Sequence, residues 1–290
     1  MKLQQWTIAR GRVLGPAPFF VAGIVNVTPD SFYDGGKCFD PAMAVAHGRS
    51  LALEGADILD VGGESTRPFS ELVSLDEELS RVVPVVEALA AHDWSQLPRV
   101  GGEAPVVSVD TNKAEVARRC LDAGASIIND VSACRFDPSL LDVLVDRQPG
   151  YVLMHSLGLP REMQIEPRYD DVVSEILAFF EERLHFLTKA GLSESRIVLD
   201  PGIGFGKTLE HNMSILRDID RFGMFGLPVY IGLSNKSLFG GLLGLEVGQR
   251  AGATQAATAL LGYRGVAVHR VHEVAAARHA LTLAQAMTQA

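Results

Sequence analysis

The sequence predicts a closed (β/α)8 barrel that forms one domain over residues 1–290. Eight short apolar runs recur along the chain without clean polar alternation, as expected of parallel strands that are covered on both faces. A longer segment with helical spacing follows each run. A doubly wound open sheet remains the alternative, because the same alternation supports it and the order of the elements does not prove closure.

The expected strands are short and rich in branched apolar residues. They cover 21–25, 58–61, 106–109, 127–128, 151–154, 197–199, 229–231 and 266–268. The expected helices cover 41–54, 76–91, 113–123, 138–146, 170–190, 210–221, 254–262 and 273–287. Several helices begin with a capping signal, such as Asp40-Pro41 or Asp137-Pro138, and several end near a glycine. This punctuation is typical of repeated βα units.

Two local features add to this pattern. Residues 6–14 are expected to form a hairpin, within an N-terminal extension of residues 1–16, that covers the floor of the barrel. Pro84 lies inside the second helical segment. Because proline lacks the backbone N–H that a helix needs, it should kink or interrupt that helix.

The composition excludes several classes of protein. Three cysteines, Cys38, Cys120 and Cys134, are too few and odd in number for a disulfide framework, so they are expected to be reduced and mostly buried. No apolar run reaches the roughly 18 residues of a membrane span, and the N-terminus lacks the apolar part of a signal peptide, so a cytoplasmic protein is expected. A net charge of −9 argues against a protein that coats nucleic acid. It leaves room for an anionic small molecule in a local cationic pocket.

Polar residues follow nearly every expected strand. In a barrel these positions meet at the C-terminal face, where active sites of this fold are built. A lone residue of this kind is often only a helix cap or a turn residue, but amides, carboxylates and cations together exceed what capping requires. The positions are Asn26, Gly62-Gly63, Asp110, Asn129-Asp130, His155, Asp200, Ser234, and Arg270 with His272.

Three of the loops after these strands carry further signals. The loops 28–37 and 62–70 are long and rich in glycine, which is typical of ligand-binding lids. Ser65, Thr66 and Arg67 in the second loop are donors suited to phosphate. The segment 200–207 (DPGIGFGK) lacks the spacing of a phosphate-binding P-loop, so no nucleotide site is inferred from it.

The last expected strand places two cationic side chains together. Arg270 and His272 are two residues apart, so they should share a face with Val266 and Val268 and point into the barrel mouth. His269 should instead face the helices. An inward-facing arginine requires a partner that offsets its desolvation, and the pair suits an anion.

Five motifs, in this order between about residues 20 and 275, together resemble bacterial dihydropteroate synthases. They are Asn26-Val27-Thr28-Pro29-Asp30-Ser31-Phe32, Asp60-Val61-Gly62-Gly63-Glu64-Ser65-Thr66-Arg67-Pro68, Asn129-Asp130-Val131, Asp200-Pro201-Gly202-Ile203-Gly204-Phe205-Gly206-Lys207 and Arg270-Val271-His272. The resemblance implies a TIM barrel that condenses 6-hydroxymethyl-7,8-dihydropterin diphosphate with 4-aminobenzoate in folate biosynthesis, giving 7,8-dihydropteroate and diphosphate. It also implies Mg²⁺ as a cofactor, sulfonamide sensitivity and a homodimer that forms through the later helices.

The resemblance assigns roles to single residues. For the pterin ring it implies Asp110, Asn129, Asp200 and Lys236, with Met154 and Phe205 around the slot. Gly232 is expected among the substrate-binding residues as well. For the diphosphate it implies Asn26 as the ligand of Mg²⁺, together with Thr66, Arg67, Arg270 and His272. For the aminobenzoate it implies Phe32, Asp34, Pro68 and Ser234. The catalytic set expected among these is Asp34, Thr66, Arg67, Lys236, Arg270 and His272.

The expected chemistry is a dissociative substitution. A leaving diphosphate needs cations and a metal ion, and the methylene on an electron-rich ring ionises early if carboxylates stabilise the developing charge. The arylamine then attacks, without a covalent enzyme intermediate. No Ser-His-Asp or Cys-His set is evident or needed.

The chain departs from the family pattern at three places. Asn235 stands where the family usually has arginine, Ser156-Leu157 where it has Met-Gln, and Tyr33 where a small residue is common. Two alternatives follow: a pterin-binding paralogue without synthase activity, and a methyltetrahydrofolate-type methyltransferase domain. The segments 65–68 and 270–272, which serve the diphosphate and the aminobenzoate, argue against the methyltransferase.

Overall fold

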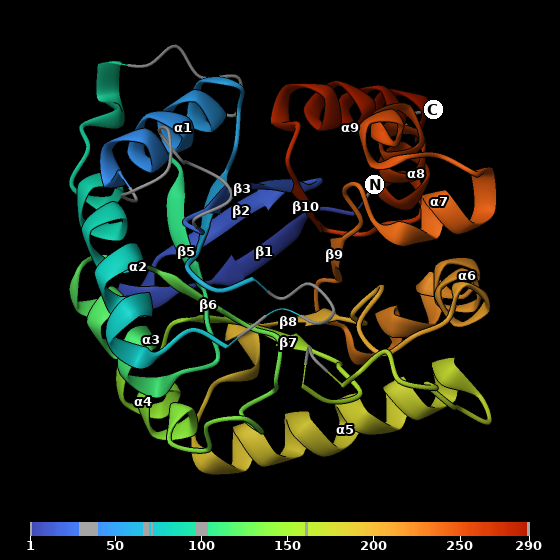
Figure 1. Cartoon of the computed structure of the whole chain (residues 1–290), viewed down its shortest axis with the longest axis horizontal. Coiled ribbons are helices and arrows are strands. Elements are labelled where there is room, and N and C mark those ends of the chain that lie inside the picture. The colour runs from blue at the N-terminus through green and yellow to red at the C-terminus, as the bar shows by residue number, and fades with distance from the viewer. Residues whose placement is uncertain are drawn as a thin grey trace.

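The computed structural model describes residues 2–28, 40–65, 70, 72–96, 104–159 and 162–288. Eight parallel strands form one sheet in the order β8-β7-β6-β5-β4-β3-β10-β9. The two outer strands meet where Leu199 N donates to Pro228 O at 3.0 Å and Leu199 bridges Val229 in parallel. This bridge brings the sheet round into a barrel (Figure 1), so the barrel is confirmed over the open sheet.

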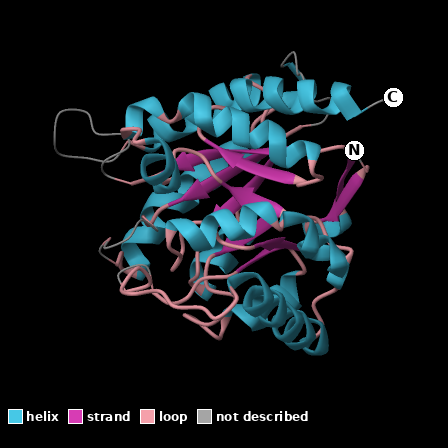
Figure 2. Ribbon diagram, turned by 90° about the vertical axis from the view of Figure 1, so that its right-hand side faces the viewer, coloured by secondary structure: helices cyan, strands magenta, loops and turns pink. Residues whose placement is uncertain are grey.

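The strands of the barrel lie close to their expected positions. They are β3 (Phe20–Asn26), β4 (Ile58–Gly62), β5 (Val106–Asp110), β6 (Ile127–Asp130), β7 (Gly150–Met154), β8 (Ile197–Asp200), β9 (Tyr230–Gly232) and β10 (Val268–Val271). Helices surround them on the outside (Figure 2). They are α1 (Pro41–Leu53), α2 (Leu75–Ala90), α3 (Ala114–Asp122), α4 (Leu140–Arg147), α5 (Val172–Ala190), α6 (Leu209–Arg217), α7 (Ser237–Leu243), α8 (Ala251–Tyr263) and α9 (Val274–Thr288).

Two helical segments differ from the expectation. Helix α7 was not predicted, because it is short and carries two adjacent glycines, Gly240 and Gly241, which are poor helix formers. The segment expected at 210–221 instead ends α6 at Arg217 and continues as the 3-10 helix η4 (Ile219–Phe225).

Of the kink or interruption expected at Pro84, the interruption does not occur. Helix α2 runs without a break from Leu75 to Ala90, with Pro84 inside it. Four apolar side chains of this helix are fully buried, and their burial offsets one missing backbone hydrogen bond. They are Val82, Val85, Val86 and Leu89.

Side-chain caps explain where some helices begin. Asp40 accepts a hydrogen bond from Ala42 N at 2.8 Å, as expected for the start of α1. Asp137 accepts in the same way from Ser139 N at 3.1 Å, just before α4 begins at Leu140. Its other oxygen, Oδ2, accepts from Ala114 N, the first residue of α3, at 2.8 Å, so that Asp137 also joins two neighbouring βα units.

The N-terminal hairpin closes the floor of the barrel, as expected. It consists of β1 (Gln4–Thr7) and β2 (Val13–Ala17), which pair antiparallel. Trp6 is 1% exposed, and its Nε1 donates to Arg196 O at 2.7 Å. The apolar cluster that fills the floor contains Trp6, Ile8, Leu14, Phe20, Ala22, Ile58, Val106, Ile127, Val152, Val198, Tyr230, Ala267 and Val268. The polar face of the barrel is therefore at the opposite end.

Candidate active site

The strand ends bring the expected polar residues together at one level of the barrel mouth. Asn26 pairs in register with Gly62, Gly62 with Asp110, and Asp110 with Asn129, across four adjacent strands. On the other side of the mouth Met154 pairs with Asp200, and Arg270 with Gly232. Because these rows lie at the carboxyl ends of parallel strands, the residues surround one site.

Arg270 points into this mouth and holds two carboxylates. Its Nε donates to Asp60 Oδ2 at 2.6 Å, and its Nη2 donates to Asp110 Oδ2 at 2.9 Å. Asn129 Nδ2 donates to the same Asp60 oxygen at 3.1 Å. The expectation that an inward-facing arginine has a partner is confirmed, and the guanidinium is fixed from two sides.

Asp60 is a member of this site that the sequence reasoning missed. Its side chain is 0% exposed, and Oδ1 has no hydrogen-bond partner within the described part of the chain. Alternation along β4 carries the signal: Ile58, Asp60 and Gly62 share the inner face, with Ile58 packed in the floor cluster. On β4 the inward-facing residue after the apolar floor residue Ile58 is thus a carboxylate. The polar half of the barrel interior, which faces the mouth, begins at this position.

Burial and the close spacing of charges shift the pKa values of Asp110 and Arg270. Burial raises the pKa of Asp110 to about 7; the guanidinium of Arg270 opposes this shift, and the carboxylate of Asp60 adds to it. Burial alone would lower the pKa of Arg270, but Asp60 and Asp110 reverse this and hold it above its usual value. Arg270 is therefore a permanent cation beside a carboxylate that titrates near neutral pH.

Asp200 and Lys236 form the other charged side of the mouth. Asp200 is 5% exposed, and its Oδ1 accepts from Gly202 N at 2.7 Å. Burial raises the pKa of Asp200 to about 6, against the Gly202 hydrogen bond and the Lys236 cation. Desolvation and the nearby Arg270 lower the pKa of Lys236 to about 8, while Asp200 and Asp110 act in the opposite direction.

An apolar wall lies between these two charged sides. Phe205 packs with Val131, Met154 and Met163. Lys236 Nζ lies 4.2 Å from the centre of the Phe205 ring, a cation–π contact. Gly204, at φ +82°, brings the backbone close to Lys236: a Cβ built there would lie 3.5 Å from Lys236 Cδ. Because Lys236 Nζ lies directly on the Phe205 ring, these two side chains form one wall and leave no space for a ring between them. A flat ring in a slot beside this wall would have its edges toward Asp110, Asn129 and Asp200.

Relatives of this chain show which family it belongs to. Residues 22–272 match the family described as "Pterin binding enzyme". The dihydropteroate synthase of Escherichia coli is 39% identical over 284 residues, which are 97% of this chain and 96% of that protein. The chain belongs to the dihydropteroate synthase family of pterin-binding enzymes.

Two further comparisons agree with this assignment. A solved structure of the Xanthomonas albilineans dihydropteroate synthase with 4-aminobenzoic acid has a TM-score of 0.88 and 44% identity, and covers 98% of this chain and 99% of that one. A probable bifunctional folylpolyglutamate synthase/dihydropteroate synthase of Haloferax volcanii is 42% identical over 88% of this chain, which spans only 29% of that longer protein. The family, the TIM-barrel fold and the transferase function expected from the sequence are confirmed.

The synthase residues expected near the second substrate are placed only in part. Ser234 Oγ lies 2.9 Å from His272 Nδ1 and also accepts from His272 N at 3.3 Å, which ties the loop after β9 to the end of β10. His272 itself is exposed at the mouth, and Asn26 is partly exposed at the end of β3. Five expected residues lie outside the described residues, as does Tyr33: Phe32, Asp34, Thr66, Arg67 and Pro68.

Two further expectations about side-chain direction have different outcomes. His269 faces the helices, is 2% exposed and contacts Val266 O through Nε2 at 3.2 Å, as expected. Val266 was expected on the inner face with Arg270, but it packs in the outer core, because β10 begins only at Val268.

Asp130 also faces outward, where Oδ2 accepts from Tyr151 Oη at 2.8 Å. Its role there is to hold the turn after β6.

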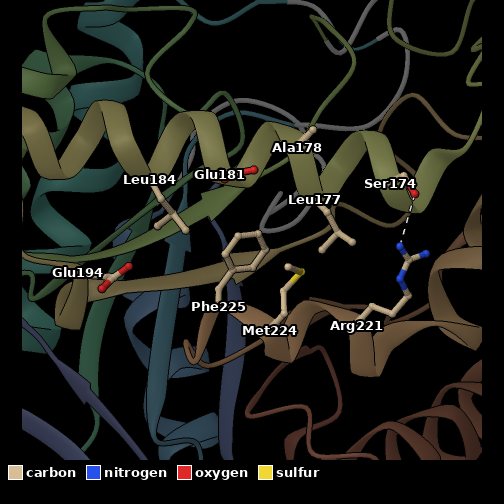
Figure 3. Close-up of a pocket in the computed structure, with 9 residues that line it drawn as sticks. All are labelled: Ser174, Leu177, Ala178, Glu181, Leu184, Glu194, Arg221, Met224 and Phe225. Atoms are coloured by element: carbon tan, nitrogen blue, oxygen red, sulfur yellow. Dashed lines mark hydrogen bonds between the residues drawn. The ribbon is translucent and has the colours of Figure 1, made fainter.

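A hollow of about 780 Å³ lies away from this mouth, on the outer side of the molecule between α5 and η4. Figure 3 shows Arg221 reaching Ser174 across it, with Met224 and Phe225 below Leu177. None of the expected synthase residues lines it. The strand ends, and not this hollow, therefore carry the site.

Proposed function

We propose that the residues gathered at the barrel mouth condense 6-hydroxymethyl-7,8-dihydropterin diphosphate with 4-aminobenzoate. The observation that supports this most is the slot beside the wall of Phe205 and Lys236, with Asp110, Asn129 and Asp200 at its edges. The family of the chain acts on this ring system. The whole chain, residues 1–290, works as one domain, because the N-terminal hairpin fills the barrel floor.

The pterin ring lies in this slot with its polar edges toward the carboxylates. Asp200 accepts two parallel N–H groups from the guanidine-like edge of the ring, while Asp110 and Asn129 hold the far edge. Met154 and Phe205 pack against the ring, Gly232 leaves room beside Arg270, and Lys236 contacts the ring. Arg270 is held rigid by Asp60 and Asp110, so its side chain loses little further entropy when substrate binds.

The diphosphate extends from the ring toward Asn26, His272 and Arg270. Thr66 and Arg67, which lie outside the described residues, are proposed to bind it as well. Within the described residues no cluster of three or more His, Cys, Asp or Glu side chains forms a metal site. A single amide ligand at Asn26 fits Mg²⁺ here, since Mg²⁺ keeps several waters and takes substrate phosphate oxygens in place of protein ligands. When bound, the ion would neutralise charge on the leaving diphosphate.

The reaction begins with departure of the diphosphate. Asp110 and Asp200, as carboxylates beside the ring, favour the cation that develops on the pterin methylene, and Arg270 and His272 favour the charge that develops on the leaving oxygen. The arylamine nitrogen of 4-aminobenzoate then attacks the methylene carbon, which forms the C–N bond in place of the broken C–O bond, and the nitrogen gives up one proton to the departed diphosphate. Phe32, Asp34, Pro68 and Ser234 hold the aminobenzoate, and closure of the first two loops excludes water as the competing nucleophile. Sulfonamides, which share the aniline ring of aminobenzoate, bind the same subsite.

The altered residue Asn235 is compatible with this activity. It adopts a left-handed backbone conformation, φ +57°, which asparagine tolerates better than most residues. Its N–H donates to Thr254 Oγ1 at 3.2 Å, and its carbonyl accepts from Arg250 Nη1 at 3.1 Å. These contacts hold the turn so that Lys236 still reaches Phe205.

A homodimer through the last three helices is the proposed assembly. Large apolar side chains are exposed on α7, α8, α9 and the short helix between α7 and α8, which lie together in Figure 1. Exposed apolar surface of this kind marks protein–protein contacts. The residues are Leu242, Leu243, Val247, Leu260, Tyr263, Leu283 and Met287. Light scattering on the purified protein should give twice the mass of one chain, and the monomer mass at micromolar concentration would contradict the dimer.

The cytoplasm is the proposed location. Cys120 and Cys134 are buried free thiols, and burial raises the pKa of both to about 12. Reduced, unreactive cysteines of this kind suit a reducing compartment. Cys38 lies outside the described residues. None of the described helices has the length and apolar character of a membrane span.

One assay tests the proposed activity directly. Purified protein is incubated with the dihydropterin diphosphate, radiolabelled aminobenzoate and Mg²⁺, and labelled dihydropteroate is the expected product. Lys236→Ala and Asp200→Ala should weaken pterin binding, whereas Arg67→Ala should mainly lower turnover. Intact pterin binding without labelled product would identify a pterin-binding paralogue that lacks synthase activity. Wild-type kinetics in all three variants would contradict the placement of the site.

A further inference from the structure

Lys207 ends the glycine-rich segment after β8 and has no part in the function proposed above. Its side chain is 2% exposed, among the largest fully buried side chains of the described residues. It does not extend toward the solvent at the mouth, where a cation for the diphosphate would lie. It turns instead into the wall between the ends of β7 and β8.

Three acceptors surround the ammonium group of Lys207. Nζ lies 3.0 Å from His155 Nδ1, 3.0 Å from Phe205 O and 3.4 Å from His155 O. An ammonium group has three donors and no acceptor, so His155 Nδ1 accepts. Burial, with the cations of Lys207 and Arg135, lowers the pKa of His155 to about 2, which keeps the ring neutral and able to accept. Lys207 thus ties the loop after β7 to the loop that carries Phe205.

This arrangement is costly for a positive charge. None of the three acceptors is a carboxylate, and among the described residues Lys207 forms no ion pair at hydrogen-bond distance. Burial lowers the pKa of Lys207 to about 7, and the nearby Asp200 carboxylate is the influence that opposes the shift. A buried charge needs compensation. The pairing is reciprocal, because Lys207 also favours the charged form of Asp200.

We propose that Lys207 is a positioning residue of the pterin site, which fixes the Phe205 loop through its hydrogen bonds and keeps Asp200 ionised through its charge. The inference rests on the proposed role of Asp200 in holding the pterin. The first effect comes from the bond to Phe205 O, since the ring of the same residue forms the wall of the slot under Lys236. The second comes from proximity. Gly202 N donates to Asp200 Oδ1 at 2.7 Å, and a Cβ built on Gly202 would lie 3.4 Å from Lys207 Nζ, so the ammonium group lies against the turn that holds the Asp200 carboxylate.

Other charged groups act on the same two residues and enter the expected pH dependence. From β10 and the loop after β9, Arg270 and Lys236 lower the pKa of Asp200 as Lys207 does. From the loops after β6 and β9, Arg135 and Lys236 lower the pKa of Lys207. Tyr169, whose Oη donates to Gly206 O and whose ring faces His155, has its pKa raised to about 12 by burial and stays neutral.

Lys207→Met provides the test, with pterin binding measured by calorimetry at pH 6.0 and pH 8.5. Loss of the cation raises the pKa of Asp200, because Lys207 lowers it in the wild type. The pKa of Asp200 is about 6 in the wild type, so a rise lowers its ionised fraction at pH 6, and the pterin affinity should fall severalfold there. At pH 8.5 Asp200 is ionised in both proteins and Lys207 is largely neutral. The charge effect therefore disappears there.

Two further variants separate charge from anchoring. Lys207→Gln keeps a hydrogen-bond donor without the charge, so it should reproduce the loss at pH 6 and bind more tightly than Lys207→Met at pH 8.5. Lys189→Met, in the exposed last turn of α5, should match the wild type at both pH values. Thermal unfolding confirms that each variant is folded at the temperature of the binding experiment.

A severalfold loss of affinity at pH 6 that shrinks to less than about twofold for Lys207→Gln at pH 8.5 supports the proposal. An equal loss at both pH values for Lys207→Gln, or unchanged affinity for Lys207→Met, overturns it. Failure of the wild type to bind the dihydropterin diphosphate would overturn the proposed function itself, and this inference with it.

Discussion

The two ends of the barrel interior are built from the same strands but have opposite chemistry. At the floor, side chains from the strands pack against Trp6, Ile8 and Leu14 of the hairpin segment, and the cluster contains aliphatic and aromatic side chains but no charged one. At the mouth, the next inward-facing residues along the strands include Asp60, Asp110 and Arg270, which form a buried ionic network. On β4 the change occurs between Ile58 and Asp60, which share the inner face.

The floor stabilises this barrel, whereas the mouth serves substrate binding. Burial of apolar surface at the floor contributes about 25 cal/mol per Å² and needs no partner geometry. Buried ion pairs at the mouth recover little beyond their desolvation cost, so stability does not explain their presence. They orient donors and acceptors toward substrate. We therefore expect floor variants to change stability alone and mouth variants to change binding.

The largest effect is expected from Arg270→Met. This change leaves the buried carboxylates of Asp60 and Asp110 without their cation, which should cost about 3–5 kcal/mol of stability. Loss of a cation that favours the leaving diphosphate should lower turnover by about 10²-fold or more. Urea unfolding and the radiolabelled assay measure the two effects. Arg168→Met, which breaks an exposed ion pair with Glu166, is the matched control and should cost at most about 1 kcal/mol.

Trp6→Ala tests the other end of the barrel. Removal of this buried ring should cost about 3–5 kcal/mol of stability, because it leaves a cavity under the floor and an unpaired Arg196 carbonyl. The pterin Kd of the folded fraction should stay within about twofold of the wild type, since one layer of side chains separates the cavity from the site. A tenfold weaker Kd, measured by calorimetry below the unfolding transition, would show that the two ends are not independent.

Asp60→Asn is expected to have an intermediate effect, which falls on pterin binding and not on stability. The amide is nearly isosteric and still accepts from Arg270 or Asn129, but it carries no charge, so Arg270 is held less firmly. Pterin affinity should fall by about tenfold, or about 1.4 kcal/mol. Because Asp60 raises the pKa of Asp110, the variant should also lower that pKa below about 7 and move the pH profile of binding to lower pH. An unchanged profile would indicate that Asp60 only fills space.

The smallest effect is expected from Ile58→Val, the floor neighbour of Asp60 on the same strand face. Loss of one buried methylene should cost about 0.5–1.5 kcal/mol of stability. Turnover and pterin affinity should match the wild type. Ile58→Val and Asp60→Asn together place the boundary between the apolar floor and the polar mouth between two successive inward-facing residues of β4. A change in affinity for Ile58→Val would move the boundary toward the floor.

The order of the elements and most of the site could be predicted from the sequence. Branched apolar runs and capped amphipathic segments are local patterns, so the eight strands and eight of the helices were found. Residues at strand ends, such as Asp110, Asn129 and Asp200, were found because a barrel brings all strand ends to one face. Helix α7 was missed because its glycines hide it, and it is stabilised by Leu238 and Phe239, which pack into the core.

Pairings between distant residues were decided only by the tertiary structure. Asp60 and Arg270 are 210 positions apart, and Lys207 and His155 are 52 apart. Nothing in the local pattern shows that a lysine in a glycine-rich loop turns inward, or that Asp137 accepts from the first residue of α3. Sequence periodicity reports which face of an element is buried, because burial acts on each residue separately. Which buried groups meet depends on strand register and barrel closure, and these arise from the packing of the whole chain.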